Sequence, residues 1–264
     1  MRNIELNGRV PSAIADIQRL ATGNFGHFTS MQVRGSAVRG LALHLARLSD
    51  ANEEFFDFRM GIDDEQRLLG LIRHALGGEP DASVQVRFVP PASPGGPPDI
   101  LVSVSDPVPD AAGPPLRVRT DGYRRDWPSH KHAATMGLTY AGKQARLAGY
   151  DDALFVGADN NRVSEGTTWN VAFYDGDRVI WPQAPMLKGV TMVLLQLALT
   201  MNGTPWTLRP VDAVELPLLA GAAAVNSHCP AQPIGSIDGM PFPADDKLVS
   251  LLRDAWESVP FDAL

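Results

Sequence analysis

Residues 129–191 read SHKHAATMGLTYAGKQARLAGYDDALFVGADNNRVSEGTTWNVAFYDGDRVIWPQAPMLKGVT. In this stretch Lys131 follows an extended segment, Glu165 lies in a Ser-Glu-Gly turn, and Gly-Val-Thr at 189–191 opens an apolar helical run. A single lysine or glutamate is most often a solvated surface residue. The order of the three features together is more typical of a cofactor site than of a binding surface.

The composition is that of an ordinary globular protein. The chain has 264 residues, of which 44% are hydrophobic and 20% charged, enough for one large domain or two smaller ones. No apolar run approaches the roughly 18 residues of a membrane helix, and the first residues lack the apolar core of a secretory signal. A net charge of −7 argues against broad nucleic-acid binding. The single cysteine, Cys229, excludes an internal disulfide framework. We therefore expect a cytoplasmic protein that binds neither membranes nor nucleic acid.

Apolar periodicity predicts alternating helices and strands in two domains. We expect helices over residues 14–20, 37–58, 65–76, 138–148, 189–203, 211–219 and 245–257. We expect strands over residues 26–35, 83–89, 99–105, 116–125, 151–157 and 207–210, and a hairpin over 167–182 that turns at Asp175-Gly176. A Pro-rich connection at 106–115 indicates a boundary between domains of residues 1–110 and 111–264.

Two histidines flank Lys131 and raise the question of a metal site. His130 and His132 stand at i and i+2 on an extended segment, so they share one face while the lysine points to the other. No third ligand follows at a recognisable spacing, and two ligands alone make a weak site. We predict no metal site.

The joint pattern resembles the class IV, or fold-type IV, pyridoxal-phosphate-dependent aminotransferases. This family includes branched-chain aminotransferase, D-amino-acid aminotransferase and aminodeoxychorismate lyase. The segments that carry the resemblance are HLARL at 44–48, Lys131, VSEGTTWN at 163–170, LKGVT at 187–191 and Asn-Ser at 226–227. The resemblance implies an α/β fold of the α+β type, with a smaller N-terminal α/β domain, a larger C-terminal pseudo-barrel domain, and assembly as a homodimer.

The resemblance also implies a role for each site residue. Lys131 would form a Schiff base with pyridoxal 5′-phosphate and move a proton during the reaction. Glu165 would keep the pyridine nitrogen protonated. The residues implied in phosphate binding are Arg47, Val190, Thr191, Asn226 and Ser227. Taken alone, Arg47 reads as an exposed helix arginine and Thr191 as a helix cap.

The implied activity is transfer of an amino group between an amino acid or amine and a 2-oxo acid. Lys131-His132 resembles the start of the lyase motif, so the alternative within the family is aminodeoxychorismate lyase, which forms 4-aminobenzoate and pyruvate. A third hypothesis is a non-catalytic member of the same fold, because the region before residue 26 is shorter than the family's opening hairpin. The tyrosine that branched-chain enzymes place after the lysine is also missing, with Thr135 and Met136 in that neighbourhood.

Overall fold

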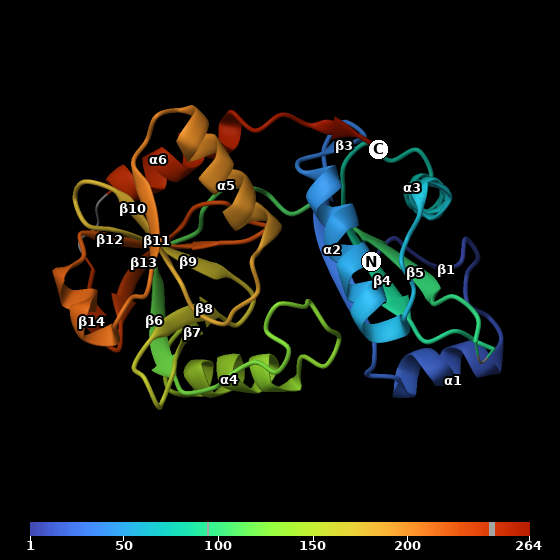
Figure 1. Ribbon diagram of the computed structural model, residues 1–264, viewed down its shortest axis with the longest axis horizontal. Coiled ribbons are helices and arrows are strands. Elements are labelled where there is room, and N and C mark those ends of the chain that lie inside the picture. The colour runs from blue at the N-terminus through green and yellow to red at the C-terminus, as the bar shows by residue number, and fades with distance from the viewer. Residues whose placement is uncertain (94, 243–245) are drawn as a thin grey trace. The chain divides into compact units, whose positions relative to one another are not determined.

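The computed structural model describes residues 1–93, 95–242 and 246–264, which form two compact units (Figure 1). Unit 1 consists of Met1–Val108, His130–Ala134 and Pro260–Leu264. Unit 2 consists of Pro109–Ser129 and Thr135–Val259. Each unit combines helices with a β-sheet, which confirms the predicted α/β class of the α+β type.

Unit 1 is a four-stranded antiparallel sheet with helices packed on one face. The strand order is β1 (Asn3–Leu6), β5 (Asp99–Ser105), β4 (Ala82–Val89) and β2 (His27–Val33). Alternate residues of β2 and β5 are buried, as expected of a sheet with one covered face. Helices α2 (Leu41–Phe56) and α3 (Ile62–Leu76) share a core with that face (Figure 1). The predicted hairpin of residues 83–89 and 99–105 is confirmed.

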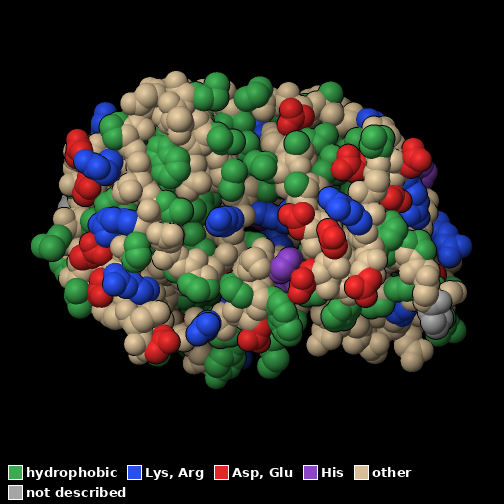
Figure 2. Space-filling view, in the orientation of Figure 1, with side chains coloured by type: hydrophobic (Ala, Val, Ile, Leu, Met, Phe, Trp, Pro, Cys, Tyr) green, Lys and Arg blue, Asp and Glu red, His purple; other side chains and the backbone are tan. Residues whose placement is uncertain are grey.

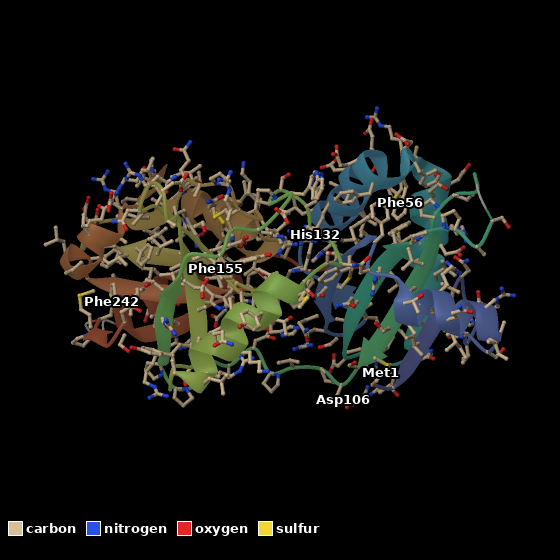
Figure 3. All side chains as sticks on the ribbon, turned by 90° about the horizontal axis from the view of Figure 1, so that it is seen from below. Met1, Phe56, Asp106, His132, Phe155 and Phe242 are labelled. Carbon is tan, nitrogen blue, oxygen red and sulfur yellow. The ribbon has the colours of Figure 1, made fainter. Side chains whose placement is uncertain are left out.

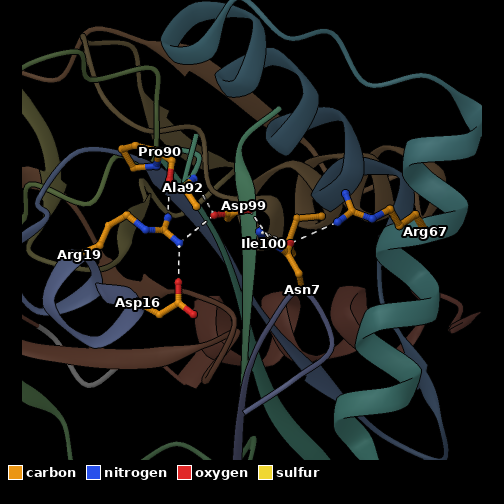
Figure 4. A network of polar contacts seen from close by, with 8 residues as sticks. All are labelled: Asn7, Asp16, Arg19, Arg67, Pro90, Ala92, Asp99 and Ile100. Carbon is orange, nitrogen blue, oxygen red and sulfur yellow. Dashed lines mark hydrogen bonds and ion pairs between the residues drawn. The ribbon is translucent and has the colours of Figure 1, made fainter. Parts of the chain in front are cut away.

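Helix α1 (Ile14–Thr22) is attached to unit 1 through polar contacts, since none of its residues is buried. The Arg19 guanidinium pairs with the carboxylate of Asp99 at 2.8 Å and with that of Asp16 at 3.3 Å (Figure 4). Asp99 also accepts a hydrogen bond from the Asn7 side chain at 2.6 Å. One carboxylate at the start of β5 therefore holds both α1 and the turn after β1.

The end of the chain caps α2. The short strand β15 (Asp262–Ala263) pairs antiparallel with β3 (Ala37–Val38). The Asp262 carboxylate accepts a hydrogen bond from the Leu41 amide at 2.9 Å, where a helix start has no intrahelical acceptor for its N–H groups. The predicted helix over 37–58 is therefore too long: Gly40 has a left-handed φ of 73°, so α2 begins at Leu41.

Unit 2 is built on strands that close into a ring. The strands β9 (Asn170–Tyr174), β12 (Gly221–Val225), β13 (Gln232–Ile237), β6 (Leu116–Asp121), β7 (Asp152–Val156) and β8 (Val163–Gly166) are neighbours in that order. Strand β8 pairs back with β9, with Glu165 opposite Asn170. This closure is the predicted pseudo-barrel. Beyond β9, the sheet continues through β10 (Val179–Pro182) and β11 (Trp206–Arg209), while β14 (Met240–Pro241) pairs with β13.

The helices of unit 2 are α4 (Met136–Leu147), η1 (Ala213–Leu218), α5 (Val190–Met201) and α6 (Asp246–Glu257). Helix α4 packs over Phe155 of β7, which is labelled in Figure 3. Most boundaries differ from prediction by a few residues. For example, α3 begins at Ile62 with Gly61 as its N-cap, and β6 ends at Asp121 rather than at residue 125. The helix predicted over 211–219 is the 3-10 helix η1. The predicted start of the last helix, at residue 245, lies outside the described residues.

Charged side chains of both signs are interspersed on the face drawn in Figure 2, without a large patch of one sign. None of the helices in the described part of the chain combines the length and hydropathy that a bilayer crossing requires.

Candidate functional site

Lys131 is part of an extended segment that runs along the edge of β2 in unit 1. Its carbonyl accepts a hydrogen bond from the Phe28 amide at 2.9 Å, and the Ala133 amide donates to the Gly26 carbonyl at 2.8 Å. Gly26 has a φ of 130°, and a Cβ there would lie 2.2 Å from the Phe88 carbonyl oxygen, so the position requires glycine. The backbone of Lys131 is thus fixed by sheet-like contacts.

Beside Lys131 lie an aromatic ring and a buried histidine. The Nζ atom is 4.8 Å from the centroid of the Phe28 ring, within the range of a cation–π contact. Burial lowers the pKa of His44 to about 3, and the nearby charges of Arg47 and Lys131 act in the same direction. The His44 ring is held by Thr29, with 2.7 Å between Nδ1 and the hydroxyl oxygen. Unit 1 therefore brings two predicted site residues, Arg47 and Lys131, near one neutral histidine.

A second buried histidine supports the same strand. The Nε2 atom of His27 lies 2.8 Å from the Asn52 side-chain oxygen on α2, and the ring stacks on Phe88 with 5.3 Å between centroids. Burial lowers the pKa of His27 to about 4. His27 and His132 are paired through a backbone bridge. The His27 ring packs in the interior of unit 1, and His132 pairs with His27 through the main chain.

Glu165 lies in unit 2, where β8 meets β9, and is buried. One of its carboxylate oxygens, Oε2, accepts a hydrogen bond from the Leu187 amide at 3.2 Å. Arg125 is also buried. Burial lowers the pKa of this guanidinium, while the charge of Glu165 opposes that shift. Glu165 is thus a buried carboxylate close to the positive charge of Arg125.

The segment that leads into α5 is held against the same closure by Asn170. The Asn170 amide nitrogen donates to the Leu187 carbonyl at 2.7 Å, and its oxygen accepts from the Gly189 amide at 3.0 Å. Gly189, not Thr191, is the N-cap of α5, so the capping role considered for Thr191 is not observed. The first amides of α5, including those of Val190 and Thr191, have no intrahelical acceptor. They form a potential anion site.

The turn between Glu165 and Asn170 is braced by Asp152. This carboxylate accepts hydrogen bonds from the Thr167 hydroxyl at 2.7 Å and from the Trp169 indole nitrogen at 2.8 Å. Sequence reasoning missed Asp152, Arg125 and Asn170 as site residues. Asn170 alone had a signal, because it closes the VSEGTTWN segment.

Asn226 and Ser227 follow the end of β12, where Val225 is paired with Asn170. The Asn226 side-chain oxygen accepts from the amides of His228 and Cys229, both at 2.9 Å. This side chain therefore shapes the turn that carries Ser227. Unit 2 brings Glu165, Val190, Thr191, Asn226 and Ser227 to linked segments at one end of its strand ring.

These residues fit the chemical needs of pyridoxal phosphate. A reactive aldehyde needs an amine, which a lysine such as Lys131 can supply. A protonated ring nitrogen needs an anion, and Glu165 is a buried carboxylate with one oxygen engaged by Leu187. A phosphate needs N–H donors and positive charge, which the start of α5 and Arg47 offer. The amine and the arginine belong to unit 1, and the other groups to unit 2.

Comparisons with known proteins agree with this chemistry. Residues 26–237 match the family model described as "Amino-transferase class IV". No curated protein matches the chain.

Solved structures share the fold of this chain. The branched-chain amino acid aminotransferase of Escherichia coli has a TM-score of 0.83 at 14% identity, covering 97% of this chain and 93% of its own. A branched-chain amino acid aminotransferase from Thermoproteus uzoniensis, solved with norvaline, has a TM-score of 0.79 at 17% identity, with the same coverage of 97% and 93%. A candidate 4-amino-4-deoxychorismate lyase from Legionella pneumophila has a TM-score of 0.77 at 21% identity, covering 93% of this chain and 96% of its own.

Proposed function

Because the chain belongs to the class IV amino-transferase family, we propose that it is a pyridoxal-phosphate-dependent enzyme that transfers an amino group between an amino acid or amine and a 2-oxo acid. One observation carries this proposal. The buried Glu165 is hydrogen-bonded to the same loop that leads into the first amides of α5, which links a carboxylate for a ring nitrogen to donors for a phosphate.

Lys131 is the residue proposed to bind the cofactor covalently. When bound, pyridoxal phosphate supplies an aldehyde and an electron-poor ring that takes up the electron pair released at the substrate's Cα. The Lys131 amine would hold the cofactor through that aldehyde and, when free of it, would carry a proton at the substrate's Cα. The main-chain contacts of Lys131 with Phe28 and of Ala133 with Gly26 set where the Lys131 side chain starts.

The other residues hold the ring and the phosphate. Glu165 would accept a hydrogen bond from the ring nitrogen and keep that nitrogen protonated, since a buried carboxylate stabilises a neighbouring positive charge. We propose that Arg47 and the amides of Val190 and Thr191 bind the phosphate, with the Thr191 hydroxyl. The turn at Asn226-Ser227 would add a hydroxyl donor.

Assays with the substrates of both reactions would distinguish an aminotransferase from aminodeoxychorismate lyase. Purified protein with pyridoxal phosphate would be mixed with a panel of amino donors and 2-oxo acids and, separately, with aminodeoxychorismate. We expect the keto product of the donor and the amino product of the acceptor. Release of pyruvate and 4-aminobenzoate without amino transfer would support the lyase instead. The resemblance of Lys131-His132 to the start of the lyase motif is the reason to test this alternative. If no donor changes the absorbance of the bound cofactor, the non-catalytic hypothesis holds.

We also propose a homodimer in the cytoplasm, on the family resemblance and the composition alone. Light scattering of the purified protein should give twice the 28.5 kDa of one chain, and the mass of a single chain would contradict the dimer.

A further inference from the structure

We infer that Asn170 is a positioning residue that fixes the distance between the carboxylate of Glu165 and the start of α5. The inference rests on the proposed function, because these are the groups proposed to hold the ring nitrogen and the phosphate of one cofactor. It adds a residue to which the sequence motif gave no role.

Both polar atoms of the Asn170 side chain form hydrogen bonds with the loop that leads into α5. Asn170 is the first residue of β9 and is 4% exposed. Its nitrogen donates to the Leu187 carbonyl at 2.7 Å, and its oxygen accepts from the Gly189 amide at 3.0 Å. Because its nitrogen and oxygen both contact the main chain of the loop, its function is to hold that loop.

The Leu187 peptide carries the link onward to Glu165. While its carbonyl accepts from Asn170, its N–H donates to the Glu165 Oε2 atom at 3.2 Å. Glu165 and Asn170 are themselves paired across the ring closure. The contacts from Glu165 through Leu187 and Asn170 to Gly189 thus form a continuous path between the carboxylate and the helix start.

The close approach at Gly189 shows that this loop is fitted to the asparagine. A Cβ atom at Gly189 would lie 2.3 Å from the Asn170 side-chain oxygen, which is far inside a normal contact distance. The amide oxygen therefore occupies the space that a side chain at Gly189 would need. Since hydrogen bonds to phosphate weaken outside a narrow range of distance, a displaced Gly189 would misplace the amides of Val190 and Thr191.

The test compares two ligands that differ only in the phosphate. Protein freed of cofactor would be titrated with pyridoxal 5′-phosphate and with pyridoxal, and binding followed by protein fluorescence. For Asn170→Ala we expect the affinity for pyridoxal phosphate to fall by about tenfold or more, the effect of losing two hydrogen bonds. The affinity for pyridoxal should fall by a smaller factor, so the preference for the phosphorylated ligand shrinks.

A control variant on the same strand separates positioning from general loss of stability. The Tyr174 hydroxyl donates to the Gly176 carbonyl at 2.9 Å at the far end of β9, so Tyr174→Phe also removes a contact to a backbone carbonyl. It should keep the preference of the wild type. If Asn170→Ala does not fold, Asn170→Ser, which is polar but too short to reach both groups, takes its place.

Two different negative results are possible, and they distinguish failure of the Asn170 inference from failure of the proposed phosphate site. If the wild type prefers the phosphorylated ligand and the Asn170 variants keep the same preference, Asn170 does not position the phosphate site. If the wild type binds pyridoxal phosphate no better than pyridoxal, the phosphate site itself is wrong, and the inference fails with it.

Discussion

Lys131 and Glu165 are given unequal roles in this account, so their removal should have unequal effects. Lys131→Ala removes the amine that binds the cofactor and moves the proton, and turnover should become undetectable. Glu165→Gln keeps a side chain of the same shape but removes the anion beside the ring nitrogen. A charge-assisted hydrogen bond of this kind is worth about 1.5–3 kcal/mol.

If a similar free energy appears in the barrier, Glu165→Gln lowers the rate by roughly ten- to a hundredfold. Steady-state kinetics of both variants on the best substrate pair would measure this difference. The cofactor absorbance should persist in Glu165→Gln, because Lys131 is still present. An unchanged rate in Glu165→Gln, or near-normal turnover in Lys131→Ala, contradicts the division of roles.

Single residues were proposed where a motif surrounds one reactive group. Lys131 and Glu165 stood out only through the joint pattern of motifs that resembles the class IV family. Asp152 and Arg125 did not, because their importance comes from contacts with Trp169 and Glu165 that neither spacing nor residue type reveals. Whether the seven predicted site residues bind the cofactor stays a prediction.

At the level of elements, the packing of α2 on β2 depends on two histidines that are neutral in the folded protein. Burial lowers the pKa of His44 to about 3 and of His27 to about 4, while an unfolded histidine titrates near pH 6.5. Below that pH the unfolded chain binds more protons than the folded one. The free energy of unfolding should therefore fall as the pH drops from 6.5 towards 4.

The effect of each histidine is about 1.4 kcal/mol per pH unit within that window. Urea unfolding between pH 4 and 8 would compare the wild type with His44→Gln, in which the residue no longer titrates. The variant should lose less stability on acidification than the wild type. Parallel curves for the wild type and His44→Gln would contradict the buried neutral histidine.

Most elements followed from the sequence, and the exceptions have physical causes. The alternation in 83–89 and 99–105 and the Asp175-Gly176 turn gave two hairpins that the structure confirms. The helix predicted over 37–58 began too early, because Ala37–Val38 form β3 and the left-handed backbone at Gly40 prevents a helix there. The pairing of β8 with β9 closes the ring, and no local pattern encodes it.

At the scale of the whole molecule, long-range pairing places some segments in a unit that their position in the sequence does not predict. Residues 130–134 join the edge of β2 about a hundred residues earlier, and residues 260–264 cap α2 through Asp262. Family resemblance supplied the pseudo-barrel, which periodicity alone did not give. Substrate identity depends on side chains around a bound substrate, and neither the motifs nor the fold specify it.

The central claim is that this chain binds pyridoxal phosphate covalently through Lys131. The chain has four lysines, Lys131, Lys143, Lys188 and Lys247, so the site of attachment can be mapped without ambiguity. Protein incubated with pyridoxal phosphate would be reduced with borohydride, digested and analysed by mass spectrometry, with Lys131→Ala as the control. We predict that the phosphopyridoxyl label is found on Lys131 and is lost in the variant. A wild type that takes up no label, or a label on Lys143, Lys188 or Lys247 that persists in Lys131→Ala, would contradict the account.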